Sequence, residues 1–134
     1  MLPALAKLLN HSDRLVLCKY FNFSFNFLNL INIPMKLADV CWALSYVTDD
    51  TPAKIQAVVD SGCVSRLVKL LTMEDVAIVT PALRSVGNIV TGDDRQTDAA
   101  LAANVLPNLV LLLEHNKANI IKVSFFFVFF NILN

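Results

Sequence analysis

Apolar side chains recur at three- and four-residue spacing through residues 37–122, as they do along one face of an amphipathic helix. Proline and glycine mark the ends of these runs. Pro52 opens one helix and Gly62 ends it at a C-cap position, whereas Pro81 marks a helix start or a kink. The pattern predicts an all-α protein with helices at Leu2–Asn10, Leu37–Thr48, Ala53–Asp60, Val64–Leu71, Glu74–Val90, Asp93–Ala103, Pro107–Leu113 and, beginning a last one, Ala118–Lys122.

A repeat of 42 residues underlies this pattern. The segment from Leu37 to Ile78 and the segment from Val79 to Ile120 are two copies of one three-helix unit, and their apolar positions superpose, as Leu67 does on Leu109. A helical period of about 40 to 47 residues indicates an armadillo or HEAT-type solenoid. We therefore expect an armadillo-type superhelix of about two repeats, a class that mostly binds partners rather than catalysing reactions.

Two stretches rich in phenylalanine and asparagine do not fit the repeat. All nine phenylalanines lie in Leu17–Lys36 and Val123–Asn134, and both stretches resemble aggregation-prone segments more than helices of the repeat. Removing the first block restores the period. We hypothesise that both blocks are translated non-coding sequence or a wrong gene prediction, and the alternative is a genuine lineage-specific insertion. The expected organisation is a partial repeat at 1–16, an atypical insertion at 17–36, armadillo repeats at 37–122 and an atypical apolar tail at 123–134.

Composition narrows the class of protein further. The 134 residues are enough for one domain at most, and 11 basic side chains balance 11 acidic ones, so no net charge attracts nucleic acid or an anionic membrane. The Phe-rich blocks are too short in uninterrupted apolar sequence for a membrane span. Cys41 and Cys63 lie in apolar helical surroundings and are expected to be buried small hydrophobes in a reducing compartment. The N-terminus lacks the pattern of a signal peptide.

The sequence contains none of the usual residue combinations that carry out enzyme chemistry. No cysteine or histidine lies at metal-ligand spacing, and there is no Ser/His/Asp or Cys/His set and no glycine-rich phosphate loop. The run Thr91–Asp94 superficially resembles a phosphate or metal motif, but no lysine or third ligand accompanies it. We therefore predict no catalytic activity, no metal and no cofactor.

Two helix faces are candidates for peptide binding. Trp42 and Tyr46, and one period later Arg84 and Asn88, are spaced i, i+4, so each pair shares one face of its helix. In a stacked solenoid such faces form rungs on the concave wall. A tryptophan ring there accepts a lysine or arginine side chain for about 0.5–2 kcal/mol, and asparagine bonds a peptide backbone. In the alternative interpretation, Trp42 is a core residue, and Arg84 and Asn88 lie on a solvated helix face.

A family resemblance strengthens the peptide-binding reading. The chain closely resembles importin alpha, the armadillo adaptor that binds nuclear localisation signals, over about 37–122 together with 1–16. The stretch around Arg84 is the most specific, because arginine stands there where the repeats usually have tryptophan. Asp50 departs from the family, which usually has glycine at that position. The stretches that carry the resemblance are Leu37–Asp49, Lys54–Gly62 and Pro81–Asp94.

The resemblance implies a set of peptide-binding residues. In importin alpha this central region divides a major binding groove from a minor one. Arg84 is expected to pair with an acidic group or to cap peptide carbonyls, and to disfavour a cation in its own slot. Asp49–Asp50 and Asp93–Asp94 are first of all N-cap residues. The implied site residues are Asp39 and Trp42 at the edge of the major groove, and Tyr46, Arg84, Asn88, Val90, Thr91, Gly92 and Asp94 in the minor groove.

The resemblance also implies partners and a place in the cell. The expected partners are basic nuclear localisation signals of cargo and, for full-length members, importin beta, whose basic binding segment is not found in this sequence. The expected location is the cytoplasm and the nucleus. We interpret the chain as a fragment of such an adaptor whose own binding is weak or nil, because tight binding needs several rungs together. The alternatives are another armadillo peptide-binding scaffold or a non-functional truncated gene product.

Overall fold

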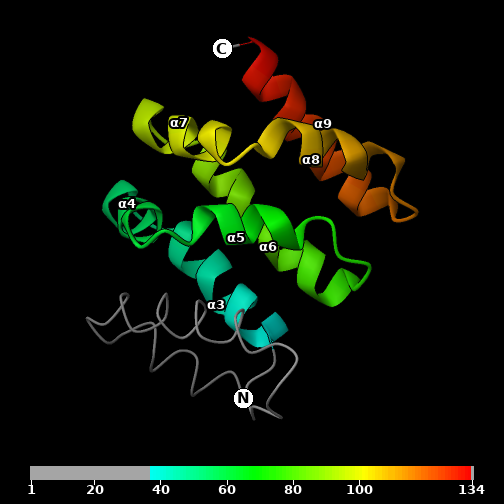
Figure 1. Cartoon of the computed structure of the whole chain (residues 1–134), viewed down its shortest axis with the longest axis horizontal. Helices are drawn as coiled ribbons and strands as arrows, with labels where there is room; N and C mark the ends of the chain where they lie inside the picture. Colours follow the sequence, from blue (N-terminus) through cyan, green and yellow to red (C-terminus); the bar gives the residue numbers. More distant parts are fainter. Residues whose placement is uncertain (1–36, 134) are drawn as a thin grey trace.

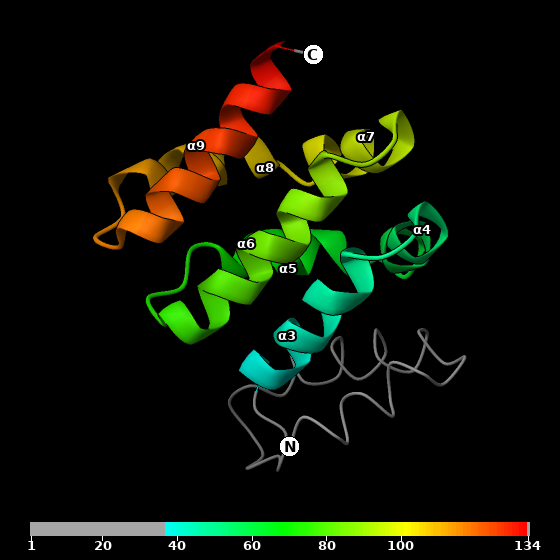
Figure 2. The same ribbon diagram turned by 180° about the vertical axis from the view of Figure 1, so that it is seen from behind.

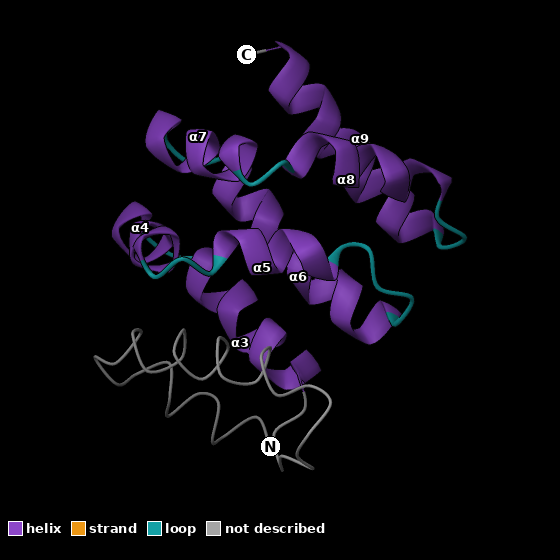
Figure 3. Ribbon diagram, in the orientation of Figure 1, coloured by secondary structure: helices purple, strands orange, loops and turns teal. Residues whose placement is uncertain are grey.

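The computed structural model describes residues 37–133, so the predicted helix Leu2–Asn10, the partial repeat at 1–16 and the insertion at 17–36 lie outside the described residues. The described chain is helical throughout and has no strand, which confirms the all-α prediction (Figures 1 and 3). Its elements are α3 (Leu37–Thr48), α4 (Pro52–Asp60), α5 (Val64–Leu70), α6 (Val76–Val90), α7 (Asp94–Ala102), α8 (Val105–Leu111), the 3-10 turn η1 (Leu112–Glu114) and α9 (Ala118–Leu133).

Local signals explain where α4 begins and ends and where α6 begins. Pro52 is the first residue of α4, and Gly62 follows its end with φ of 75°, a left-handed conformation that favours glycine. The Asp75 side chain accepts a hydrogen bond from the Ala77 N–H at 2.9 Å, so α6 begins at Val76, two residues later than predicted. This cap sets the start upstream of Pro81, which lies inside α6 rather than at its start.

The next two helices also follow their caps. Asp93 is the N-cap of α7, as the paired aspartates predicted, and the structure adds a capping box with Gln96. Asn104 adopts a left-handed φ of 64° before α8, so that helix begins at Val105 and not at Pro107. Pro107 is then the third residue of α8, where a backbone N–H has no partner within the helix.

The helices stack as successive three-helix units. The units α4–α5–α6 and α7–α8–α9 follow one another, and α3 occupies the position of the third helix of a preceding unit (Figure 1). Seen from behind, α3, α6 and α9 lie in that order across one face of the molecule (Figure 2). Because α3 and α6 pack together, the faces that bear the two predicted rungs come from neighbouring repeats.

The core follows the 42-residue period. Leu67 and Leu109, which superpose in the sequence, are both fully buried on their respective second helices. Cys41 and Cys63 are also fully buried, as predicted, and burial raises the pKa of the Cys41 thiol to about 12. Both side chains therefore serve as small apolar core residues rather than as reactive thiols.

The Phe-rich segment at 123–133 continues α9 as a helix, where the sequence predicted a segment unlike the helices of the repeat. The inner side of α9 explains the difference: Ile120 and Ser124 are buried, and the Phe127 ring packs against the backbone of Gly87 on α6. Tertiary packing overrides the β-propensity of the aromatic residues. Three phenylalanines stay more than half exposed, namely Phe125, Phe126 and Phe129.

Among residues 37–133, no single helix is both long enough and apolar enough to cross a bilayer. The bent pair Asp94–Ala102 and Val105–Glu114, with 72° between its halves, meets the test by length and composition alone.

Candidate peptide-binding site

The rung on α3 is an aromatic pair at the surface. Trp42 is half-buried and Tyr46 is 46% exposed, and their ring centroids lie 6.3 Å apart at an interplanar angle of 32°. Asp39 lies on the same helix face one turn earlier and is also half-buried. This face therefore offers an aromatic surface beside a carboxylate, which suits the stem and ammonium of a lysine side chain.

Arg84 on α6 lies across the gap to the α3 rung. Its guanidinium carbon is 5.2 Å from the centroid of the Tyr46 ring, and its Nη2 donates to Asp49 Oδ2 at 2.5 Å. The predicted acidic partner of Arg84 is thus a residue of the chain itself, at the end of the α3 helix. Because both side chains are well exposed, this ion pair adds little to stability and mainly orients the guanidinium.

Asn88 lies one turn after Arg84 and contacts the end of α3. Its Nδ2 donates to Thr48 Oγ1 at 3.3 Å and to the Ser45 carbonyl at 3.4 Å. Both bonds are long, hence weak. The amide therefore bridges two repeats while it retains the ability to bond a peptide backbone at small cost.

A cleft lined by carboxylates opens where the ends of α3 and α6 meet the starts of α4 and α7. Its volume is about 330 Å³. Asp50 pairs with Lys54, and the Asp93 side chain accepts from the Gln96 N–H at 3.0 Å. We call this the carboxylate cleft, and its lining residues are Thr48, Asp49, Asp50, Pro52, Ile55, Asn88, Thr91, Gly92, Asp93 and Gln96.

Asp49 and Asp50 do not cap a helix, so the prediction that they are N-cap residues is wrong. The N-cap of α4 is Thr51, and Asp50 Oδ1 instead accepts from the Thr51 N–H at 2.7 Å. Asp49 is held by Arg84, as described above. Thr51 stands one 42-residue period before Asp93, so the two N-caps are equivalent, and Asp49 and Asp50 precede the cap and lie at the surface of the cleft.

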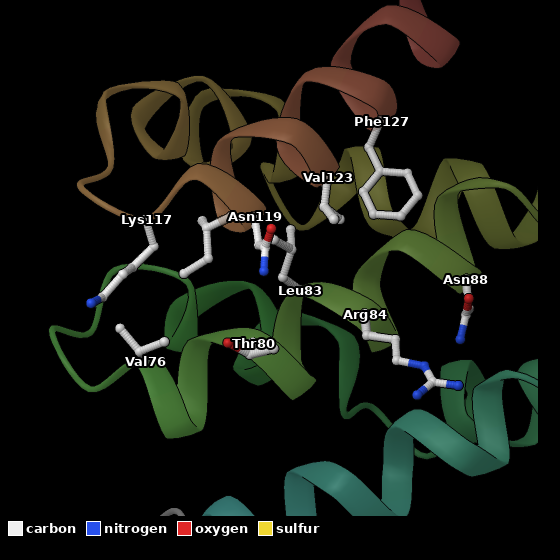
Figure 4. Close-up of a pocket in the computed structure, with 10 residues that line it drawn as sticks. Val76, Thr80, Leu83, Arg84, Asn88, Lys117, Asn119, Val123 and Phe127 are labelled. Carbon is white, nitrogen blue, oxygen red and sulfur yellow. The ribbon is translucent and has the colours of Figure 1, made fainter.

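A second cleft, of about 360 Å³, lies between α6 and α9 (Figure 4). Asn88 lines both clefts and so marks the boundary between them. Most of this lining was not predicted, because it depends on how α9 docks on α6. We call it the α6–α9 cleft, and its lining residues are Val76, Thr80, Leu83, Arg84, Asn88, Lys117, Asn119, Ile120, Val123 and Phe127.

The remaining predicted site residues fall into two groups. Thr91 and Gly92 line the carboxylate cleft, and Asp94 is exposed at the first turn of α7 beside it. The predicted role of Val90 in peptide binding stays a prediction, and its side chain is fully buried in the core and does not reach the surface. The helical period explains this, because Val90 lies two residues from Asn88 and therefore on another face of α6.

Comparison with known proteins defines the class. An armadillo/beta-catenin-like repeat matches residues 51–91. An engineered protein of known structure is 27% identical with a TM-score of 0.67 and covers 78% of this chain and 42% of its own. A designed armadillo repeat protein in complex with the peptide (KR)4 has a TM-score of 0.68 at 22% identity and covers 97% of this chain and 63% of its own. The fold is an armadillo-type solenoid.

The sequence relatives narrow this class to one family. Importin subunit alpha-1b of Oryza sativa subsp. japonica is 52% identical over 86 residues, which are 64% of this chain and 16% of that protein. Importin subunit alpha-1a of the same organism is 43% identical over 121 residues, or 90% of this chain and 19% of that protein. Importin subunit alpha-3 of Arabidopsis thaliana is 50% identical over 86 residues, which are 64% of this chain and 16% of that protein.

The chain belongs to the importin alpha family, as the sequence resemblance predicted. It spans less than a fifth of the length of these relatives.

Proposed function

We propose that the face formed by α3 and α6 binds an extended basic peptide of the nuclear localisation signal type, within a protein that acts as a nuclear import adaptor. The observation that carries this proposal is the alignment of two rungs from consecutive repeats beside a carboxylate-lined cleft. A lysine side chain would lie against Trp42 with its ammonium toward Asp39. A second cationic group would be attracted to the carboxylate cleft.

Arg84 supports a division of this surface into two segments. Its guanidinium covers the Tyr46 ring and neutralises Asp49, so the position between the rungs is already occupied by a cation of the chain. A peptide lysine would be repelled there. Basic side chains should therefore bind on the Trp42 side and along the carboxylates, with a gap at Arg84, which agrees with the boundary between major and minor grooves implied by the family resemblance.

The proposal extends to partners and location. Cargo proteins with basic import signals are the expected ligands, importin beta is the expected partner of full-length family members, and the cytoplasm and nucleus are the expected locations. Two rungs give only a small part of the binding energy of a longer array, so we expect weak binding to this chain alone.

Charge reversal tests the proposal. We expect the double variant Asp39→Lys/Asp94→Lys to weaken binding of a labelled lysine-rich peptide by about three- to tenfold in fluorescence anisotropy, because two attractive contacts become repulsive. The matched control is Asp60→Lys, at the exposed end of α4, where a cation is favoured by the helix dipole. Equal loss in the double variant and in the control, or no loss in either, would contradict a site on this face.

A further inference from the structure

The α6–α9 cleft differs in chemistry from the carboxylate cleft. Its walls are apolar, built by Leu83 from α6 and by Val123 and Phe127 from α9, and Lys117 and Arg84 lie toward opposite ends (Figure 4). No lining residue is acidic. A cationic side chain would thus meet like charge and an apolar wall in this cleft, whereas an apolar side chain next to an anion would be accommodated.

Lys117 and Arg84 both carry N–H groups that can donate hydrogen bonds to an anionic partner. Lys117 is exposed at the mouth of the cleft, with three N–H donors on a flexible stem. Arg84 uses Nη2 toward Asp49, and its planar guanidinium carries five N–H donors in all. The positive side of the cleft is therefore held mainly by Lys117, with Arg84 as a partly neutralised second group.

The surface beside the cleft continues the apolar character. One period after Arg84 and Asn88 stand Phe126 and Phe130, whose rings stack at a centroid distance of 6.3 Å. Phe126 is 57% exposed. This third rung offers an aromatic surface and no side-chain hydrogen bond to a peptide backbone, so it favours apolar side chains over a backbone held by asparagine.

We propose that the α6–α9 cleft binds a peptide segment in which an aromatic side chain stands next to a carboxylate. The aromatic ring would occupy the space between Leu83, Val123 and Phe127, and the carboxylate would pair with Lys117. The volume of about 360 Å³ is at the lower end of the range for ligand sites, which suits one large side chain with its backbone. The site goes beyond the basic-peptide site and has the opposite charge preference.

The test is a two-dimensional amide NMR titration of the full chain with the unlabelled peptide Ser-Gly-Glu-Phe-Glu-Gly-Ser. We expect the shifts to centre on the amides of Leu83, Asn119 and Val123. Lys117→Glu and Val123→Asp should each weaken binding about three- to tenfold, while Asp60→Lys should leave it unchanged. Lys117 and Val123 are both exposed, so these variants should keep the fold, which circular dichroism checks.

Two comparison peptides make the outcome decisive. Replacing the phenylalanine by alanine, or both glutamates by lysine, should reduce binding at the cleft. Equal or tighter binding of the lysine peptide at these amides, or shifts that Val123→Asp leaves unaltered, would overturn the proposal. Shifts confined to Trp42 and its neighbours would also overturn it. Binding at the basic-peptide site is measured separately, from the shifts of Trp42 and its neighbours. Failure of the α6–α9 cleft proposal and failure of the basic-peptide proposal can therefore be distinguished.

Discussion

Replacing Gly87 by alanine is expected to lower the free energy of unfolding by about 1–3 kcal/mol, although alanine is the better helix former. A Cβ at this position would lie 1.8 Å from Cζ of the Phe127 ring and 2.1 Å from Cε2. The intrinsic gain from alanine is about 1 kcal/mol, which overpacking against the ring should exceed. The substitution should therefore displace α9 from α6.

Urea denaturation followed by circular dichroism measures this effect. In the double variant Gly87→Ala/Phe127→Ala the clash is removed, so the two substitutions should be non-additive and the alanine at 87 should become neutral or favourable. A single Gly87→Ala variant more stable than the parent protein would show that the Phe127 ring does not fill this space.

The second large effect is expected at Gln96, which is fully buried at the first turn of α7. Its Nε2 donates to the Pro52 carbonyl at 3.0 Å, and its Oε1 accepts from the Asp93 N–H at 3.1 Å. Gln96 therefore closes the capping box of its own helix and joins the starts of α4 and α7 in consecutive repeats. Gln96→Ala should lower the free energy of unfolding by about 1–3 kcal/mol, since both partners lose a hydrogen bond.

Gln56 provides the matched control for this prediction. It is half-buried on α4, and its Nε2 donates to the exposed Asp60 at 2.7 Å, within one helix. Gln56→Ala should change the free energy of unfolding by no more than about 0.5 kcal/mol. Equal effects of the two substitutions in thermal or urea unfolding would contradict a special role of Gln96 in joining the repeats.

The repeat and its rungs could be predicted from the sequence because they depend on linear spacing. The 42-residue period places Trp42 and Arg84 on equivalent helices of consecutive repeats, and the i, i+4 spacing adds Tyr46 and Asn88 to the same faces. The aspartates, proline and glycine at helix ends predicted most of the boundaries, since caps act within a few residues.

The features that the sequence did not predict depend on contacts between distant segments. Arg84 and Asp49 are 35 residues apart, and nothing in either local pattern indicates that they pair. The helical state of the Phe-rich segment depends on the fit of Phe127 against Gly87, which β-propensity and charge do not report. The assignment of the tail at 123–134 and of the block at 17–36 as foreign sequence stays a hypothesis, and sequencing the transcript would test it.

The central claim is that the face of α3 and α6 binds basic peptides, and Trp42 provides a direct probe because it is the single tryptophan of the sequence. Its emission should be followed while a lysine-rich import-signal peptide is added to the full chain. We predict a saturable change that weakens as salt is raised and is absent with a glutamate-rich peptide of equal length. An emission unchanged by the basic peptide, or changed equally by both, would contradict the claim.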